Sequence, residues 1–209
     1  LACETKVIAD MGCDGAERAA GLGMPLNGGN YAPGPYDVDA YRTQVRCVVT
    51  NKAPYSAYRG YGKDLANMMI ERVLDQAADK LEIDPVAIRR RNLLNQYPHQ
   101  LCTGPVIENG SLSEALEKII DVMDLDALRR RQSEALEQGR YIGFCVVPYI
   151  EPAGATFPGS AFQNYESVAV RVAADGSVHV MTGIQNIGQG IETVYAQVTA
   201  DLLGCHMRD

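Results

Sequence analysis

The sequence predicts an α+β fold in two units, with mixed, mostly antiparallel sheets and amphipathic helices. Two observations lead to this prediction. Apolar residues recur with the period of an α-helix over 64–81. Two runs with the period of a strand, 166–173 and 177–184, flank Asp175-Gly176, a pair typical of a hairpin turn. We place the boundary between the units near residue 139, so that they span 1–138 and 139–209.

The first unit begins with a short candidate strand at 5–10. Residues 12–36 hold seven glycines and three prolines, and we expect a long irregular segment because these residues disfavour regular elements. Residues 42–51 form the next expected strand. The helix over 64–81 follows after a glycine-containing turn.

Three further helices are expected before the boundary. Asp84 and Pro85 are residues preferred at the N-cap and first helical position, so a short helix begins there. Ser111 and Glu114 have the spacing of a capping box and predict a second helix. The charged stretch 125–139 is the third, ending at its glycine.

The second unit is expected to open with a strand at 141–150, followed by a loop at 151–164 and the hairpin. A last helix ends at Gly204. Its apolar residues form one predicted stripe, made of Ile191, Val194, Tyr195, Val198 and Leu202.

Composition excludes several classes of function. Apolar residues make up 46% of the 209 residues, so the chain can bury a core. The net charge of -7 disfavours nucleic acid, because its phosphates would repel the chain. We interpret the arginine triplets 89–91 and 129–131 as solvated helix faces. No apolar stretch is long enough to span a bilayer.

The six cysteines are scattered, with no C-x-x-C pair, so neither a zinc site nor a disulfide framework is predicted. Reduced thiols in a cytoplasm fit this pattern best. No residue stands out as a catalytic group or metal ligand.

Two glycine turns at helix starts are the candidate sites. In the first, Arg59 could bind an anion and Tyr61 could stack on a planar substrate, with Gly60 between them. The competing interpretation is that the tyrosine packs on the helix and the arginine caps a carbonyl. Composition alone does not separate these two alternatives.

The second turn is Gly188-Gln189-Gly190. Glycines before a helix let a ligand approach unpaired N–H groups, so this turn could bind a phosphate, or an amide-rich ring through the Gln189 carboxamide. The alternative is a tight turn with a surface glutamine. Neither turn completes a P-loop or a dinucleotide-binding glycine motif.

Two stretches of the chain resemble a known family. Residues 50–94 are similar to the segment around the A-[FY]-R-G-[FGA]-G loop of molybdenum hydroxylases, and residues 180–204 to the stretch that contains G-Q-G in those enzymes. The resemblance is to the molybdopterin-binding large subunit of the xanthine dehydrogenase, aldehyde oxidase and carbon monoxide dehydrogenase group. It covers most of the chain, with both motifs in family order.

The resemblance implies roles for both turns. Gln189 would hydrogen-bond the molybdenum centre or its pterin, with Gly188 and Gly190 allowing close approach. The backbone of Arg59 and Gly60 would pass near the metal. Tyr61 would stack on the substrate.

Departures from the family pattern are informative. Copper-containing carbon monoxide dehydrogenases carry a cysteine where this chain has Gly60, which argues against a molybdenum–copper centre. Asn186 stands where the family usually has an acidic residue, and Lys63-Asp64 replaces a proline-containing pair. The family's catalytic glutamate lies far beyond the matched stretch, so we expect this chain to be an internal fragment that lacks it.

For the parent protein, the resemblance implies oxidative hydroxylation of an aldehyde or N-heterocycle-type carbon with water. It implies a molybdopterin cofactor in the cytosine dinucleotide form, a small-molecule substrate, and iron–sulfur and FAD partner domains or subunits beside the rest of the large subunit. Isolated, the chain is expected to be inactive and to lose cofactor. A non-catalytic scaffold without metal and a nucleotide-phosphate site at the helix starts are the alternatives.

Overall fold

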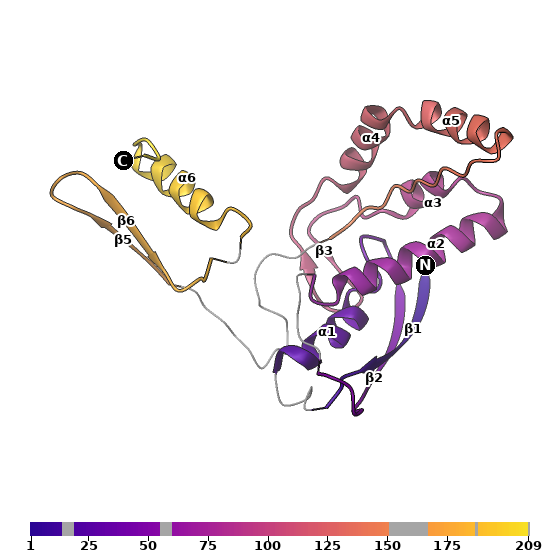
Figure 1. Ribbon diagram of the computed structural model, residues 1–209, viewed down its shortest axis with the longest axis horizontal. Coiled ribbons are helices and arrows are strands. Elements are labelled where there is room, and N and C mark those ends of the chain that lie inside the picture. Colours follow the sequence, from indigo (N-terminus) through magenta and orange to yellow (C-terminus); the bar gives the residue numbers. More distant parts are fainter. Residues whose placement is uncertain (14–18, 55–59, 151–166, 187, 209) are drawn as a thin grey trace. The chain divides into compact units, whose positions relative to one another are not determined.

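The structure, a computed structural model, describes residues 1–13, 19–54, 60–150, 167–186 and 188–208. The chain divides into two compact units, Leu1–Ala153 and Gly154–Asp209, and most of their elements are labelled in Figure 1. Packing thus assigns 139–153 to the first unit, while the boundary between cofactor-binding units near residue 139 stays a prediction. The predicted α+β class is confirmed, because helices accompany one parallel and two antiparallel strand pairs in the described part.

The first unit opens with a parallel strand pair. β1 (Ala2–Asp10) aligns residue for residue with β2 (Ala40–Val48). Parallel strands need a crossover between them, and this crossover contains α1 (Ala19–Asn30). The Tyr41 hydroxyl donates to the Gly29 carbonyl at 2.7 Å, which ties β2 to the end of α1.

The prediction of an irregular segment at 12–36 was wrong for the residues of α1. This helix contains four glycines and Pro25, a composition with very low intrinsic helix propensity. α1 lies against β1, β2 and α2, so tertiary packing stabilises a helix that the local sequence disfavours. Glycine is needed at several of these positions because neighbouring segments approach the helix closely.

The two predicted helices that follow are confirmed. α2 (Lys63–Leu81) buries Ala66, Ile70, Leu74 and Ala78, four residues spaced one helical turn apart. α3 (Pro85–Asn92) begins at the predicted cap, where Asp84 Oδ1 accepts from the N–H groups of the second and third helical residues, both at 2.9 Å.

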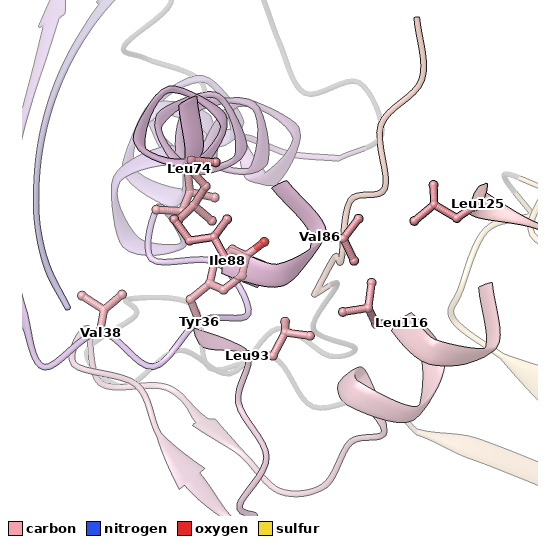
Figure 2. Close-up of a cluster of buried hydrophobic side chains, with 10 residues drawn as sticks. Tyr36, Val38, Leu74, Val86, Ile88, Leu93, Leu116 and Leu125 are labelled. Atoms are coloured by element: carbon pink, nitrogen blue, oxygen red, sulfur yellow. The ribbon is translucent and has the colours of Figure 1, made fainter. Parts of the chain in front are cut away.

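Figure 2 shows the core of the first unit, which draws side chains from α2, α3, α4, the start of α5 and the segment after α1. Apolar burial of this kind contributes roughly 25 cal/mol per Å² removed from water. The cluster consists of Tyr36, Val38, Ile70, Leu74, Ala78, Val86, Ile88, Leu93, Leu116 and Leu125.

A short hairpin and two helices complete the regular elements of this unit. The sequence did not predict the hairpin of β3 (His99–Gln100) and β4 (Val106–Ile107). α4 (Leu112–Met123) and α5 (Leu125–Glu137) were predicted. The capping-box prediction was wrong, because the Ser111 side chain makes no cap hydrogen bond. Its backbone φ of -129° and ψ of 38° lies outside the extended geometry usual for such caps.

The strand predicted at 141–150 does not form. None of these residues pairs in a described strand, although exposed and half-buried residues alternate along the whole segment. Phe144 and Val146 pack against the core of the first unit. The sequence pattern therefore predicted the two alternating faces, but a strand also needs a hydrogen-bonding neighbour.

A buried ion cluster corrects the interpretation of residues 89–91 as a solvated face. Arg89 is only 2% exposed. Its Nε lies 2.7 Å from Glu71 Oε2, its Nη2 lies 2.8 Å from Asp75 Oδ1, and its Nη1 donates to the Pro85 carbonyl at 2.8 Å. The Tyr36 hydroxyl donates to the other Glu71 oxygen at 2.5 Å. Because a buried charge needs such partners, this cluster joins α2 to α3.

The second unit contains the predicted hairpin and helix. β5 (Val168–Val172) pairs antiparallel with β6 (Val178–Thr182) across the predicted turn. α6 (Ile191–Leu203) ends at Gly204 in the left-handed conformation, as the glycine stop predicted.

The predicted apolar stripe of α6 is divided between two faces. Val194 and Val198 are each 51% exposed and Leu202 is 83% exposed. Tyr195 and Ala196 are half-buried and Ala200 is buried, on the face that lies near β6. Ile191 and Tyr195 of the predicted stripe lie on that face together with small and polar residues, so hydrophobicity alone identified the packed face only in part.

Candidate functional site

The first glycine turn, Gly60-Tyr61-Gly62, leads directly into α2 and has a constrained backbone. The three φ angles are +105°, +46° and +89°. Glycine adopts such angles readily, whereas Tyr61 is held in a region that side-chain-bearing residues rarely occupy. The Lys63 N–H donates to the Gly60 carbonyl at 3.0 Å and closes the turn.

α1 holds this turn in place. Asn27, which is 5% exposed, donates from Nδ2 to the Tyr61 carbonyl at 3.1 Å. A β-carbon added at Gly62 would lie 2.0 Å from the Met24 carbonyl oxygen, so the two backbones are in contact. A β-carbon added at Gly23 would lie 2.0 Å from the Tyr61 hydroxyl. Backbone and side chain of Tyr61 are therefore both fixed against the same helix.

An acidic side chain accompanies this turn. A β-carbon added at Gly60 would lie 3.3 Å from the carboxyl carbon of Asp64, in the first turn of α2. The carboxylate is thus close to the helix start, where it interacts favourably with the helix dipole. A phosphate bound at the same place would be repelled by this negative charge.

The second glycine turn also has a left-handed backbone throughout. Gly188, Gln189 and Gly190 have φ angles of +91°, +64° and +68°. Gly190 is the N-cap of α6, and glycine has no side chain to accept from the first N–H groups of the helix. All three residues are exposed in the second unit.

Asn186 organises this turn through both ends of its amide. Its Oδ1 accepts from the Gly188 N–H at 3.1 Å, and its Nδ2 donates to Glu192 Oε1 at 2.8 Å. A carboxylate at position 186 could accept the first bond but could not donate the second. The asparagine is therefore matched to Glu192, which gives a physical reason for this departure from the family pattern.

A cavity of about 370 Å³ lies beside the second turn, between β6 and α6. Its lining is mostly apolar, with Asn186 and Glu192 among its polar members. Thr182 Oγ1 donates to the Tyr195 hydroxyl at 3.4 Å within the same lining. Small-molecule sites combine concave apolar surface and few polar groups in this way.

The structure brings only some of the predicted site residues together. Gly60 and Tyr61 share the turn before α2, and Gly188–Gly190 share the turn before α6. Arg59 lies outside the described residues, and its role stays a prediction. The two turns belong to different units.

Sequence reasoning missed Gly23 and Asn27, which contact the first turn from α1, and the link from Asn186 to Glu192. The glycine-rich composition of 19–30 was a signal of close approach, but it was interpreted as irregular structure. The pairing of Asn186 and Glu192 follows from their placement around the turn.

Asp10, the last residue of β1, links the end of this strand to the segment that precedes the first turn. Its Oδ1 accepts from the Gly12 N–H at 3.1 Å and from Thr50 Oγ1 at 2.6 Å, and its Oδ2 pairs with Lys52 at 2.6 Å. These bonds, led by the one from Lys52, lower the pKa of Asp10 to about 2. The carboxylate thus joins the end of β1 to residues 50–52.

The second turn has an exposed side chain and open space beside it. Gln189 offers an exposed carboxamide, and nothing lies within 4 Å of a β-carbon built on Gly190. Among the residues that the structure describes, no group of three His, Cys, Asp or Glu side chains could hold a metal ion.

Within the same residues, no helix is both long and apolar enough to cross a membrane.

Both candidate turns lie within stretches that match cofactor-binding domains. Residues 1–93 and residues 118–209 each match the family described as "Molybdopterin cofactor-binding domain". The chain belongs to the family of molybdopterin-binding large subunits of the molybdenum hydroxylases, as the resemblance predicted.

Relatives of known name agree with this assignment. The nicotine 6-hydroxylase large subunit of Paenarthrobacter nicotinovorans is 34% identical over 82% of this chain and 22% of its own length. The carbon monoxide dehydrogenase large chain of Hydrogenophaga pseudoflava is 31% identical over 98% of this chain and 27% of its own length. The chain thus spans about a quarter of these relatives.

A solved structure shows the same fold. Quinoline 2-oxidoreductase from Pseudomonas putida 86 superposes with a TM-score of 0.87, at 31% identity, over 97% of this chain and 27% of that one. The arrangement of helices and small sheets described above is therefore that of part of a large molybdenum hydroxylase subunit.

Proposed function

We propose that the chain is part of a molybdenum hydroxylase that oxidises an aldehyde or N-heterocycle-type carbon with oxygen from water. In this proposal the chain supplies part of the cofactor-binding wall and one substrate-facing turn. Electrons leave through iron–sulfur and FAD groups on partner domains or subunits. The proposal covers the full-length protein, of which this chain corresponds to about a quarter in its relatives.

One observation carries the proposal: an exposed carboxamide stands between two glycines at the start of α6. The left-handed backbone of Gly188 and Gly190 leaves the Gln189 side chain uncovered in its unit. Asn186 holds that turn by accepting from the Gly188 N–H and donating to Glu192. Such a turn supports contact between Gln189 and a large cofactor, with the flanking glycines admitting it.

The first turn contributes the substrate side of the proposal. Gly60 has no side chain, so its backbone is open to close approach. By the resemblance, the backbone of Arg59 and Gly60 passes near the metal. Tyr61 offers an aromatic ring whose backbone is fixed by Asn27. A ring held in this way suits stacking on a planar substrate.

When bound, the molybdenum cofactor supplies the redox chemistry of the hydroxylation. The residues of this chain bind and orient, and none is proposed to transfer the proton. The Glu192 carboxylate accepts a hydrogen bond from Asn186 beside the second turn, and the Asp64 carboxylate lies beside Gly60 of the first. We therefore assign both carboxylates a structural role in the turns. The base is expected in the part of the protein beyond this chain.

The alternative of a nucleotide-phosphate site at the two helix starts is less well supported. Each helix already has an acidic residue in its first turn, Asp64 in α2 and Glu192 in α6. A phosphate would meet negative charge at both places.

The named relatives favour an N-heterocycle over carbon monoxide as substrate. Two of them are named for nicotine and quinoline. This chain is also similar to carbon monoxide dehydrogenases, but it has Gly60 where the copper-containing members carry a cysteine. No thiol is therefore available at that position to bind copper.

The remaining parts of the proposal concern assembly. The cofactor is proposed in its cytosine dinucleotide form, as the resemblance implies. Relatives named as a large subunit and as the gamma subunit of a complex support partner subunits. All six cysteines are free thiols, which supports a reducing, cytoplasmic compartment.

The test is molybdenum content and turnover of the natively purified full-length protein. We expect molybdenum in the wild type. Gln189→Ala should lower cofactor content or kcat/KM by roughly 10–100-fold, the usual effect of removing a supporting contact.

Gln185→Ala is the matched control, because it removes another exposed glutamine of the same unit and should leave both quantities unchanged. A wild type without molybdenum would replace the enzyme proposal with the scaffold alternative. Equal effects of the two substitutions would remove Gln189 from the cofactor wall.

A further inference from the structure

The ring of Tyr61 lies on a helix position that has no side chain. A β-carbon built on Gly23 would be 2.0 Å from the Tyr61 hydroxyl oxygen, 2.6 Å from Cζ and 2.9 Å from Cε1. These distances are shorter than any β-carbon tolerates. The observed position of the phenol therefore requires glycine at residue 23.

The backbone of the same turn is fixed independently of the ring. Asn27 is buried and donates to the Tyr61 carbonyl. Gly62 touches the Met24 carbonyl, where no β-carbon would fit. Gly23 thus locates the ring of Tyr61, whereas Met24 and Asn27 locate the main chain of the turn.

We propose that Gly23 is a specificity-determining position, which sets the room for substrate by letting the hydroxyl end of the Tyr61 ring lie against α1. This inference rests on the proposed function, in which Tyr61 faces the substrate. Gly23 touches no substrate itself and acts through the ring as a positioning residue.

The substitution Gly23→Ala separates this role from folding. Alanine has a higher intrinsic helix propensity than glycine. The clash is with the end of a side chain that has two rotatable bonds, so rotation of Tyr61 relieves it. We expect the helix to persist and the ring to move away from α1, into the space proposed for the substrate.

The experiment compares kcat/KM of the full-length enzyme for a one-ring and a two-ring N-heterocycle. Gly23→Ala should lower the two-ring to one-ring ratio about tenfold, a typical effect of a small steric change in a pocket. Gly28→Ala is the matched control, because its β-carbon would meet Leu65 Cδ2 at 3.1 Å and, at the ordinary van der Waals distance of 3.4 Å, the Gly62 carbonyl oxygen, but would not meet the Tyr61 ring. It should leave the ratio unchanged.

A double-mutant cycle assigns the effect to the ring. In a Tyr61→Ala background, Gly23→Ala should change the ratio by less than about twofold, because the partner is gone. An equally large change in that background would overturn the proposal.

Fluorine NMR of fluorotyrosine placed at position 61 reads the ring position without turnover. Gly23→Ala should shift this resonance and Gly28→Ala should not. An unmoved resonance overturns control of the ring by Gly23. Absence of molybdenum and turnover in the wild type, with a shifted resonance, instead overturns the proposed function and the specificity role that rests on it.

Discussion

At the scale of single residues, several positions are fixed by main-chain geometry rather than by side-chain chemistry. Gly62 combines a left-handed φ of +89° with contact to the backbone of α1. Tyr61 adopts a positive φ beside it, and its carbonyl is held by Asn27. Strain at such a residue persists only where the surroundings enforce it.

Gly62→Ala is predicted to be strongly destabilising. Two costs add: about 1–2 kcal/mol for a left-handed residue with a β-carbon, and the clash with the Met24 carbonyl at 2.0 Å, which no side-chain rotation relieves. We expect loss of soluble full-length protein or a marked fall in the urea midpoint.

Gly104→Ala provides the matched control, because Gly104 has a φ of +107° but nothing within 4 Å of an added β-carbon. It should show the conformational cost alone. Equal losses at the two positions would mean that contact with α1 contributes nothing.

Asp10 gives a pH dependence whose sign follows from its pKa. The folded pKa is about 2, below the ordinary 3.8, so its stabilising effect is present above the unfolded pKa and is lost as pH falls through about 2. The difference in urea midpoint between wild type and Asp10→Asn should be constant near neutral pH. It should shrink toward zero on acidification. A difference that grows on acidification would contradict the assignment.

At the scale of elements, the joint between α2 and α3 depends on a buried charge cluster. Burial raises the pKa of the Glu71 carboxyl, and the bonds from Tyr36 and Arg89 counter that rise. Burial beside Glu71 also raises the pKa of Tyr36. Arg89 must therefore stay in place to keep the carboxylate partnered.

Arg89→Ala is predicted to cost about 3–5 kcal/mol, because it leaves Glu71 buried without its cation. Arg90→Ala is the control, since its pair with Glu117 at 2.5 Å is about half exposed and such pairs contribute at most about 1 kcal/mol. Hydrogen exchange of α2 and α3 amides in the full-length protein measures both. Similar exchange in the two variants would show that the buried cluster adds no stability.

The elements that the sequence predicted well are those with a local signal. The period of α2, the Asp84 cap of α3, the hairpin turn and the Gly204 stop each depend on residues close together in the chain. α1 lacked such a signal, because its glycines serve neighbours that arrive from β2 and the turn before α2. Arg89 was misjudged for the same reason, since Glu71 and Tyr36 lie far away in sequence.

At the scale of the whole molecule, the site was predictable only in part. The two glycine turns were identified from their motifs, and the family assignment followed from them. The contacts that position those turns, through Gly23, Asn27 and Glu192, depend on tertiary packing and were not predictable from motifs. The cofactor role of Gln189 and the substrate role of Tyr61 stay predictions for the full-length protein.

The segment 141–150 has a consequence for any strand that joins it. Phe144 and Val146 pack against the core of the first unit, so this core defines which face of the segment points inward and which points outward. An incoming strand shifted by one residue would present its own side chains to the opposite faces. The packing of 141–150 on the first unit therefore restricts the register in which a further strand could pair with this segment.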